Sequence, residues 1–138
     1  MENAYGLGGK IENVKKLADM GVVYMTLCHS SDNDVCNSSS KTADPNKGLT
    51  EFGRKVVEEM NRYGIIVDLS HTSPGTFWDV YKYSKAPFIC SHSGAKAVWD
   101  HNRNITDDQL RALAEKNGEE QGKGKNEQYS LFHCDSPY

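Results

Sequence analysis

Short apolar runs rich in β-branched residues alternate with amphipathic stretches along most of the chain. The runs at 21–28, 65–70 and 87–91 have the length and composition of buried strands. The stretches at 12–20 and 49–63 place their apolar residues on one face of a helix. Strands that alternate with helices are typical of βα units, which build a parallel sheet covered by helices.

Local signals mark the ends of the predicted helices. Gly64 follows the second amphipathic stretch as a C-terminal stop. The Ser-Pro pair at 73–74 supplies an N-cap and a first-turn proline, which predicts a third helix. The Thr-Asp-Asp-Gln stretch at 106–109 has the spacing of a capping box and predicts a fourth helix, which we expect to end at about Asn117, before Gly118.

The chain divides into two regions at the end of the fourth helix. Residues 1–118 hold the predicted strands and helices, with a strand stub at 1–5, and residues 119–138 are hydrophilic without apolar periodicity. A doubly wound sheet or a (β/α)₈ barrel accommodates such units, and a complete barrel takes about 250 residues. We therefore expect the α/β fold class, with this chain forming about half of the structure if the fold is a barrel, followed by a disordered or non-native tail from residue 119.

Charge and apolar content exclude several functions. The net charge of −3 and the scattered lysines leave no basic surface for nucleic acid. The apolar runs are far shorter than the roughly 20 residues that span a bilayer, so we expect no contact with a membrane. The N-terminus lacks the pattern of a secretory signal, and cytoplasmic localisation is the expectation. No C-x-x-C pair occurs, so free thiols are expected at Cys28, Cys36, Cys90 and Cys134.

Candidate chemistry lies at the ends of the predicted strands. His29, His71 and His92 each follow one of the apolar runs. The C-terminal ends of parallel strands meet at one edge, so these three imidazoles are expected to converge on a shared cavity. Neutral imidazole is a common zinc ligand, and catalytic zinc sites combine histidines with a carboxylate and an open position. The pattern therefore predicts a metal site.

The carboxylate of that site has two candidates. Asp68 lies three residues before His71, and strand alternation favours a different face for it. Glu2 ends the stub strand, as the histidines end theirs, and is preferred, with a frayed terminal glutamate as the alternative. Arg103, in the polar loop after the third strand run, can grip a carboxylate through two hydrogen bonds. A solvated loop arginine is an equally weighted alternative.

Several short motifs follow one another along residues 1–117. They are Glu-Asn-Ala-Tyr-Gly at 2–6, Tyr-Met-Thr-Leu-Cys-His-Ser at 24–30, Gly-Leu-Thr-Glu-Phe-Gly at 48–53, Val-Asp-Leu-Ser-His-Thr-Ser at 67–73, Ser-His-Ser-Gly-Ala at 91–95 and Asn-Arg-Asn-Ile at 102–105. In their order and spacing they resemble the membrane (renal) dipeptidase family of zinc peptidases. The resemblance implies a (β/α)₈ barrel, of which this chain is a part, with two zinc ions at the C-terminal strand ends.

The resemblance also implies a role for each candidate residue. Glu2 corresponds to the carboxylate that bridges both metals, and His71 and His92 correspond to the imidazoles that complete one of them. His29 corresponds to a catalytic histidine that contacts the substrate and steadies the tetrahedral intermediate. Arg103 corresponds to the residue that binds the free carboxylate of the substrate. The implied activity is zinc-dependent hydrolysis of dipeptides by a metal-activated water.

Three differences from the family pattern limit what is expected of this chain. A His-x-Asp pair, which holds the other zinc, would lie before Met1; the aspartate of the last strand is absent; and the region after Gly118 is hydrophilic. Truncation or a frameshifted reading would explain all three, and we expect the chain to bind at most one zinc ion tightly and to hydrolyse dipeptides poorly or not at all. A non-catalytic, single-metal fragment of a dipeptidase is the alternative, and self-association into a homo-oligomer is left open.

Overall fold

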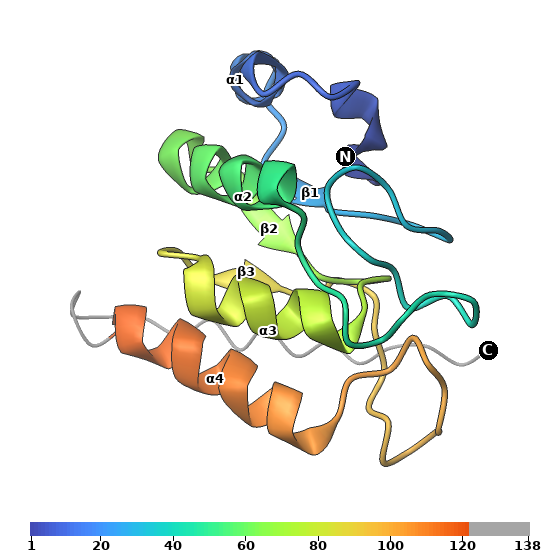
Figure 1. The fold of residues 1–138 in the computed structure, drawn as a ribbon. Helices are drawn as coiled ribbons and strands as arrows, with labels where there is room; N and C mark the ends of the chain where they lie inside the picture. Colours follow the sequence, from blue (N-terminus) through green and yellow to red (C-terminus); the bar gives the residue numbers. More distant parts are fainter. Residues whose placement is uncertain (122–138) are drawn as a thin grey trace.

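The computed structural model describes residues 1–121, which form a parallel sheet covered by helices (Figure 1). The sheet has three strands in the order β1 (Tyr24–Thr26), β2 (Ile66–Asp68) and β3 (Phe88–Ile89). Both strand pairings are parallel, with Val67 paired to Met25 on one side and to Phe88 on the other. Parallel neighbours need a crossover connection, which the helices provide, so the predicted succession of βα units is confirmed.

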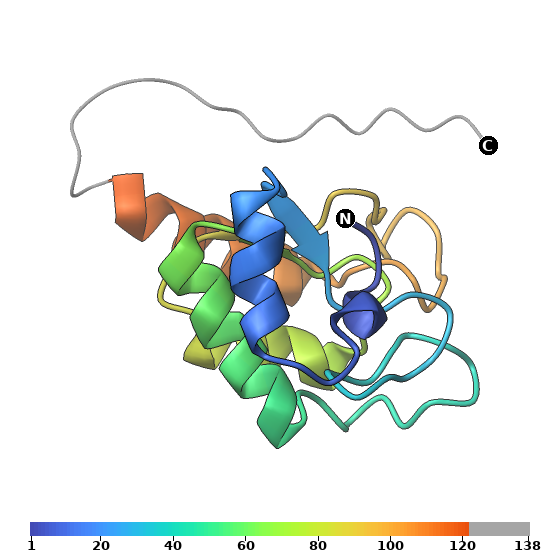
Figure 2. The same ribbon diagram turned by 90° about the horizontal axis from the view of Figure 1, so that it is seen from above.

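Helices α1 (Glu12–Asp19), α2 (Glu51–Tyr63), α3 (Pro74–Tyr83) and α4 (Asp107–Gln121) follow one another along the sheet. Each of them contacts the next in sequence. They lie in one row over one face of the sheet, and Figure 2 shows the same row from above. None of the helices in residues 1–121 has the length and apolar character to span a membrane.

The capping signals in the sequence work as predicted. The Ser73 hydroxyl accepts a hydrogen bond from the Thr76 amide at the start of α3. Before α4, Gln109 and Thr106 form a reciprocal pair in which each side chain accepts from the other's backbone amide, at 2.8 and 3.3 Å. Gly64 ends α2 with a left-handed φ of 72°, which glycine adopts without strain.

The predicted end of the fourth helix is wrong. Helix α4 continues through Gly118 to Gln121. A glycine inside a helix costs only about 1 kcal/mol relative to alanine, which the neighbouring turns can offset. The first three residues of the predicted tail are therefore helical, and the remainder of that prediction, with Cys134, lies outside the described residues. Within them, Cys28, Cys36 and Cys90 are free thiols.

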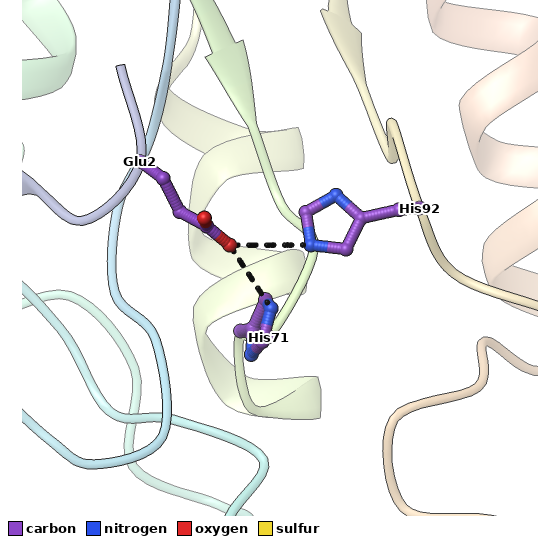
Figure 3. Close-up of side chains that lie close together, drawn as sticks. All are labelled: Glu2, His71 and His92. Carbon is purple, nitrogen blue, oxygen red and sulfur yellow. Dashed lines mark ion pairs between the residues drawn. The ribbon is translucent and has the colours of Figure 1, made fainter.

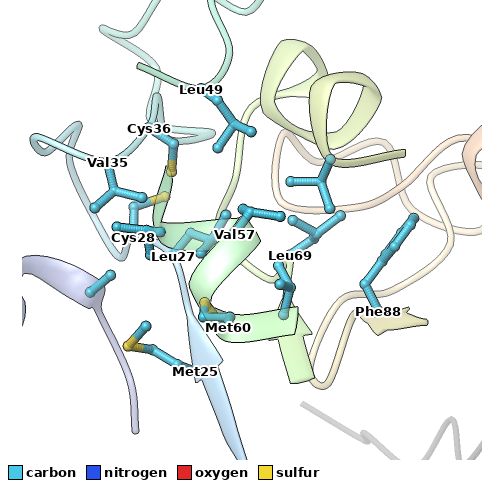
Figure 4. Close-up of a cluster of buried hydrophobic side chains, with 14 of the residues drawn as sticks. Met25, Leu27, Cys28, Val35, Cys36, Leu49, Val57, Met60, Leu69 and Phe88 are labelled. Atoms are coloured by element: carbon cyan, nitrogen blue, oxygen red, sulfur yellow. The ribbon is translucent and has the colours of Figure 1, made fainter. Parts of the chain in front are cut away.

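The core lies between the helix row and the sheet (Figure 4). Helix α2 contributes Val56, Val57 and Met60, whose spacing places them on one face of the helix, and all three are buried. The strands contribute Met25 and Val67, and neither is exposed. The opposite face of the sheet is more open, since the paired residues Tyr24 and Ile66 remain 40% and 42% exposed.

The regular strands are shorter than the apolar runs that predicted them. Leu27 and Leu69 are buried but follow the last residues of β1 and β2. The chain therefore leaves the ladder before the apolar run ends, and the residues that follow turn across the C-terminal edge of the sheet.

The N-terminal residues lie beside β1. The Met1 carbonyl accepts from the Thr26 amide at 3.1 Å, and the Met1 ammonium donates to the Tyr24 carbonyl at 2.9 Å. Of the strand stub predicted for residues 1–5, only Met1 makes strand-like contacts. The rest of that prediction is wrong, because Ala4–Leu7 forms the 3-10 helix η1, which the Asn3 side chain caps. The pairing of Met1 holds Glu2 near the C-terminal end of β1.

Candidate metal centre

Glu2, His71 and His92 meet at the C-terminal ends of the strands (Figure 3). Glu2 follows the residue paired with β1, His71 follows β2 by three residues, and His92 follows β3 by three residues. The Glu2 Oε1 atom lies 3.4 Å from His71 Nε2 and 3.5 Å from His92 Nε2. One ligand atom from each residue lies within 4.8 Å of the other two. The structure thus brings together the three residues that the sequence suggested as metal ligands.

The spacing and chemistry of this cluster suit a zinc ion. Two ligands at about 2.0 Å from a tetrahedral ion are about 3.3 Å apart, close to the Glu2–imidazole distances of 3.4 and 3.5 Å. Two imidazoles and one carboxylate form a donor set that catalytic zinc sites use, with one position left open. The residues present therefore fit a metal ion of this kind.

His71 is held in the form that a metal requires. It is buried, and burial lowers the pKa of its ring from 6.5 to about 4, assisted by the positive charge of Arg103 and by His29 and His92. A neutral imidazole has a lone pair to offer a metal. The backbone at His71 is left-handed, with a φ of 72°, and the His71 carbonyl accepts from the Ser39 amide at 2.7 Å.

His29 lies against the same cluster. Its Nε2 atom is 3.3 Å from Glu2 Oε1, and its ring stacks on His71 with centroids 4.2 Å apart. The side chain is 44% exposed and lines the cavity above the three clustered residues. It is therefore accessible to a ligand that enters the cavity.

A cavity of about 550 Å³ opens over the cluster. The loop 30–47 supplies one wall through Ser39, Ser40 and Lys41. The loop after β3 supplies the facing wall, and the Asn102 amide donates a hydrogen bond to the Ser39 carbonyl. Figures 1 and 2 show both loops on the side of the molecule where the chain begins.

Arg103 lies in the second wall of the cavity. One terminal nitrogen donates to the His92 carbonyl at 3.3 Å, and the Arg103 amide donates to His101 Nδ1 at 3.2 Å. Its Nε atom is buried and has no hydrogen-bond partner among the described residues. The guanidinium is therefore anchored beside His92 and retains donors for a ligand.

Asp68 does not join the cluster. It is fully buried and accepts hydrogen bonds from Thr26 Oγ1 at 2.8 Å and Ser91 Oγ at 2.6 Å. Burial opposes its ionisation, but the hydrogen bonds from Ser91, Ser70 and Thr26 outweigh burial and hold its pKa below the usual value.

Two serine contacts were not anticipated from the sequence. Ser30 Oγ lies 2.7 Å from His29 Nδ1, and Ser91 Oγ lies 2.7 Å from His92 Nδ1. Each serine is a direct neighbour of its histidine in the chain. A hydroxyl adjacent to a candidate ligand histidine is the signal that could have pointed to them.

A parallel sheet covered by helices, with imidazoles and a carboxylate clustered at its C-terminal edge, defines the class as α/β proteins with a candidate metal centre. The family model of the membrane dipeptidases, peptidase family M19, matches residues 1–119. The chain belongs to this family, as the sequence motifs suggested.

Two curated relatives are dipeptidases. The chain is 42% identical over 118 residues to an uncharacterized dipeptidase of Schizosaccharomyces pombe, and the match covers 86% of this chain and 29% of the relative. It is 38% identical over 118 residues to the dipeptidase aclJ of Aspergillus oryzae, covering 86% and 28%. The chain thus spans less than a third of the length of these relatives.

Solved structures agree with the fold. An amidohydrolase from Pseudomonas aeruginosa matches with a TM-score of 0.78 and 33% identity, over 84% of this chain and 35% of that chain. A metallopeptidase from Rhodobacter sphaeroides, liganded with a phosphinate mimic of the dipeptide L-Ala-D-Ala, matches with a TM-score of 0.77 and 33% identity, over 84% and 34%. The predicted fold class, a partial (β/α)₈ barrel, is confirmed.

Proposed function

We propose that Glu2, His71 and His92 bind a zinc ion and that this centre serves the hydrolysis of dipeptides. The observation that carries the proposal is the cluster itself, in which ligand atoms from the N-terminal segment and from the turns after β2 and β3 lie within 4.8 Å of one another. The dipeptidase names of the curated relatives and the dipeptide mimic on the Rhodobacter metallopeptidase support the substrate class.

Each residue has a distinct task in this proposal. A bound zinc ion would polarise the peptide carbonyl and lower the pKa of a water. Glu2 and the neutral rings of His71 and His92 hold the ion. His29, exposed to the cavity beside Glu2, contacts the substrate near the scissile bond, and Arg103 binds the free carboxylate of the dipeptide with charge-assisted hydrogen bonds.

A non-catalytic metal-binding role is the second candidate. Residues 1–121 contain a single group of three clustered histidine, cysteine or acidic ligands, so they account for one metal ion. We propose residues 1–118 as the partial barrel domain that carries it. The two roles differ in turnover but share the same metal centre.

Zinc titration of the purified chain tests the centre. We expect about one zinc ion per chain, bound in competition with a chromogenic chelator, and at least a tenfold loss of affinity in Glu2→Gln and His92→Ala. His101→Ala is the matched control, because His101 lines the cavity but lies outside the cluster. Equal zinc affinity in the wild type and the three variants would contradict the proposed centre.

Hydrolysis of a Gly-linked dipeptide by the same zinc-loaded protein then separates the two roles. We expect turnover to be weak in this chain, since it supplies one metal ion's ligands. Turnover that is lost in Glu2→Gln supports the dipeptidase role, whereas zinc binding with no turnover at all favours the non-catalytic one.

A further inference from the structure

We propose that Asp68 is a positioning residue that fixes the ring tautomer of His92 through the Ser91 hydroxyl. The inference rests on the proposed metal-binding role of His92, but the contacts that carry it exist without a metal. They form a chain that runs from a buried carboxylate, through one hydroxyl, to the ring nitrogen on the far side of His92 from Glu2.

Asp68 acts only as a hydrogen-bond acceptor. Its Oδ1 atom accepts from the backbone amides of Ser70 at 3.1 Å and Ser91 at 3.0 Å. Its Oδ2 atom accepts from the hydroxyls of Thr26 at 2.8 Å and Ser91 at 2.6 Å. Two donors converge on each oxygen, which stabilises the ionised carboxylate and leaves no place for a proton on it.

The Ser91 hydroxyl has one proton, and Asp68 takes it. A short contact of 2.6 Å from Ser91 Oγ to Asp68 Oδ2 is typical of a hydroxyl that donates to a carboxylate. The remaining lone pairs of Ser91 Oγ face His92 Nδ1 at 2.7 Å. For that second contact to be a hydrogen bond, the proton must lie on His92 Nδ1.

A neutral ring protonated at Nδ1 has a free lone pair at Nε2. The Nε2 atom of His92 faces Glu2 Oε1 at 3.5 Å, inside the metal-sized cluster. The backbone of His92 is fixed from the same side, because its amide donates to Ser70 Oγ at 2.9 Å. Asp68 thus orients the ligand nitrogen of His92 toward the metal position without touching the metal itself.

His29 also contacts a serine hydroxyl, that of Ser30, but no carboxylate of the described residues accepts the proton of this hydroxyl. Ser30 Oγ lies 2.7 Å from His29 Nδ1, the same distance as in the Ser91–His92 pair. Within residues 1–121, the Ser30 hydroxyl makes no second hydrogen bond. The Ser30–His29 contact therefore leaves the tautomer of His29 unspecified, which makes Ser30 a matched control for Ser91.

Long-range proton–nitrogen NMR of the histidine rings in the metal-free protein tests the tautomer directly. At a pH where the rings are neutral, we expect His92 to be protonated at Nδ1. In Ser91→Ala we expect the Nε2-protonated form to gain population and zinc affinity to fall about tenfold or more. In Asp68→Asn the amide can donate to Ser91, which reverses the chain of donors and favours protonation at Nε2.

Thr26→Val is the control for the buried carboxylate, because it removes one hydrogen bond to Asp68 Oδ2 without interrupting the path to His92. We expect it and Ser30→Ala to leave the His92 tautomer unchanged, and thermal unfolding identifies any variant that fails to fold. A wild-type His92 protonated at Nε2, or a Ser91→Ala spectrum identical to wild type, overturns the inference. Failure to bind zinc would overturn the proposed function alone, since the tautomer is measured without metal.

Discussion

His71 combines an unusual backbone conformation with a shifted acid–base equilibrium. Its φ of 72° lies in the left-handed region, where a residue other than glycine, asparagine or aspartate is strained. Burial lowers the pKa of its ring from 6.5 to about 4, so the ring stays neutral at pH values where a histidine is usually protonated. Both features follow from the turn that carries the chain from β2 into α3, and both are compatible with a role as a metal ligand.

The lowered pKa of His71 makes the stability of the metal-free protein depend on pH. The folded ring titrates at about 4 and the unfolded ring at 6.5, so the unfolded chain binds more protons between these values. The free energy of unfolding is therefore unaffected by this group above pH 6.5. It falls as the pH drops toward 4, by up to about 3 kcal/mol.

Urea unfolding at several pH values in the presence of a chelator measures this dependence. His71→Asn is the control, since asparagine tolerates the left-handed backbone and has no group that titrates in this window. We expect its stability to vary less between pH 6.5 and 4 than that of the wild type. An unchanged slope in the variant would assign the effect to other groups.

Arg103 should distinguish free dipeptides from their C-terminal amides. Its partly exposed guanidinium faces the cavity beside His92, and an amide offers no negative charge to it. In the zinc-loaded protein, we expect Arg103→Ala to weaken binding of a free dipeptide by about 1–2 kcal/mol and to leave the amide nearly unaffected.

Calorimetric titration of both ligands into both proteins gives the required comparison. Arg111→Ala is the control, because Arg111 lies on α4, is 75% exposed and pairs with Asp108 away from the cavity. Equal losses for the dipeptide and the amide would show that Arg103 does not bind the carboxylate.

At this scale the sequence predicted which side chains converge but not how they are supported. Asp68 lies apart from the cluster, as expected, but strand alternation is not the reason, because His71 lies in a turn beyond the end of β2. The hydrogen bond from Ser91 to Asp68 depends on the register of β2 against β3. A single sequence does not contain that register, so the network could not be foreseen.

At the scale of elements, helix α2 is fixed by a close approach to the loop 30–47. Gly53 lies in the first turns of α2, and a Cβ atom added there would be 1.9 Å from the Val35 carbonyl oxygen. The Thr50 amide also donates to the Val35 carbonyl at 2.9 Å, and the Thr50 hydroxyl, which caps the helix, donates to the Asp34 carbonyl at 2.6 Å. The loop and the helix therefore pack backbone to backbone at this point.

Gly53→Ala should destabilise the protein although alanine is the better helix former. Helix propensity alone predicts a gain of about 1 kcal/mol, but the clash with a backbone oxygen forces the loop or the helix to move and should reverse the sign. Thermal unfolding, with Glu58→Ala at an exposed position of the same helix as control, measures the difference. A more stable Gly53→Ala protein would contradict the close packing.

Helix boundaries marked by a cap or a stop signal were more predictable than strand boundaries, whereas α4, with a glycine inside it, runs past its predicted end. The caps at Ser73 and Thr106 and the stop at Gly64 depend on residues within one turn of each other, so local sequence determines them. Strand ends depend on where hydrogen bonding to a neighbouring strand stops. Leu27 and Leu69 extend the apolar runs because they are buried, and burial does not require a place in the ladder.

For the whole molecule, a metal ion would connect parts of the chain that are distant in sequence. Glu2 precedes α1, whereas His71 and His92 follow β2 and β3. A ligand that binds only the folded arrangement stabilises it by about 2.7 kcal/mol at a hundredfold excess over its dissociation constant.

We therefore expect zinc to raise the unfolding temperature of the wild-type protein in a concentration-dependent manner. The gain should be largely lost in Glu2→Gln, which keeps the size of the side chain but removes its charge. Differential scanning calorimetry with zinc or with a chelator measures both proteins. An equal increase in wild type and Glu2→Gln would show that zinc binds elsewhere.

The packing of Trp99 on His101 provides an optical signal for the cavity. The indole is 65% exposed, and its ring centre lies 5.3 Å from that of His101, which lines the cavity. The chain's other tryptophan, Trp78, packs edge-on against Phe77 in α3. A ligand that displaces His101 would change the surroundings of the indole and therefore the emission of Trp99. In Trp78→Phe, all tryptophan fluorescence would come from Trp99, so it would report the binding of a ligand in the cavity.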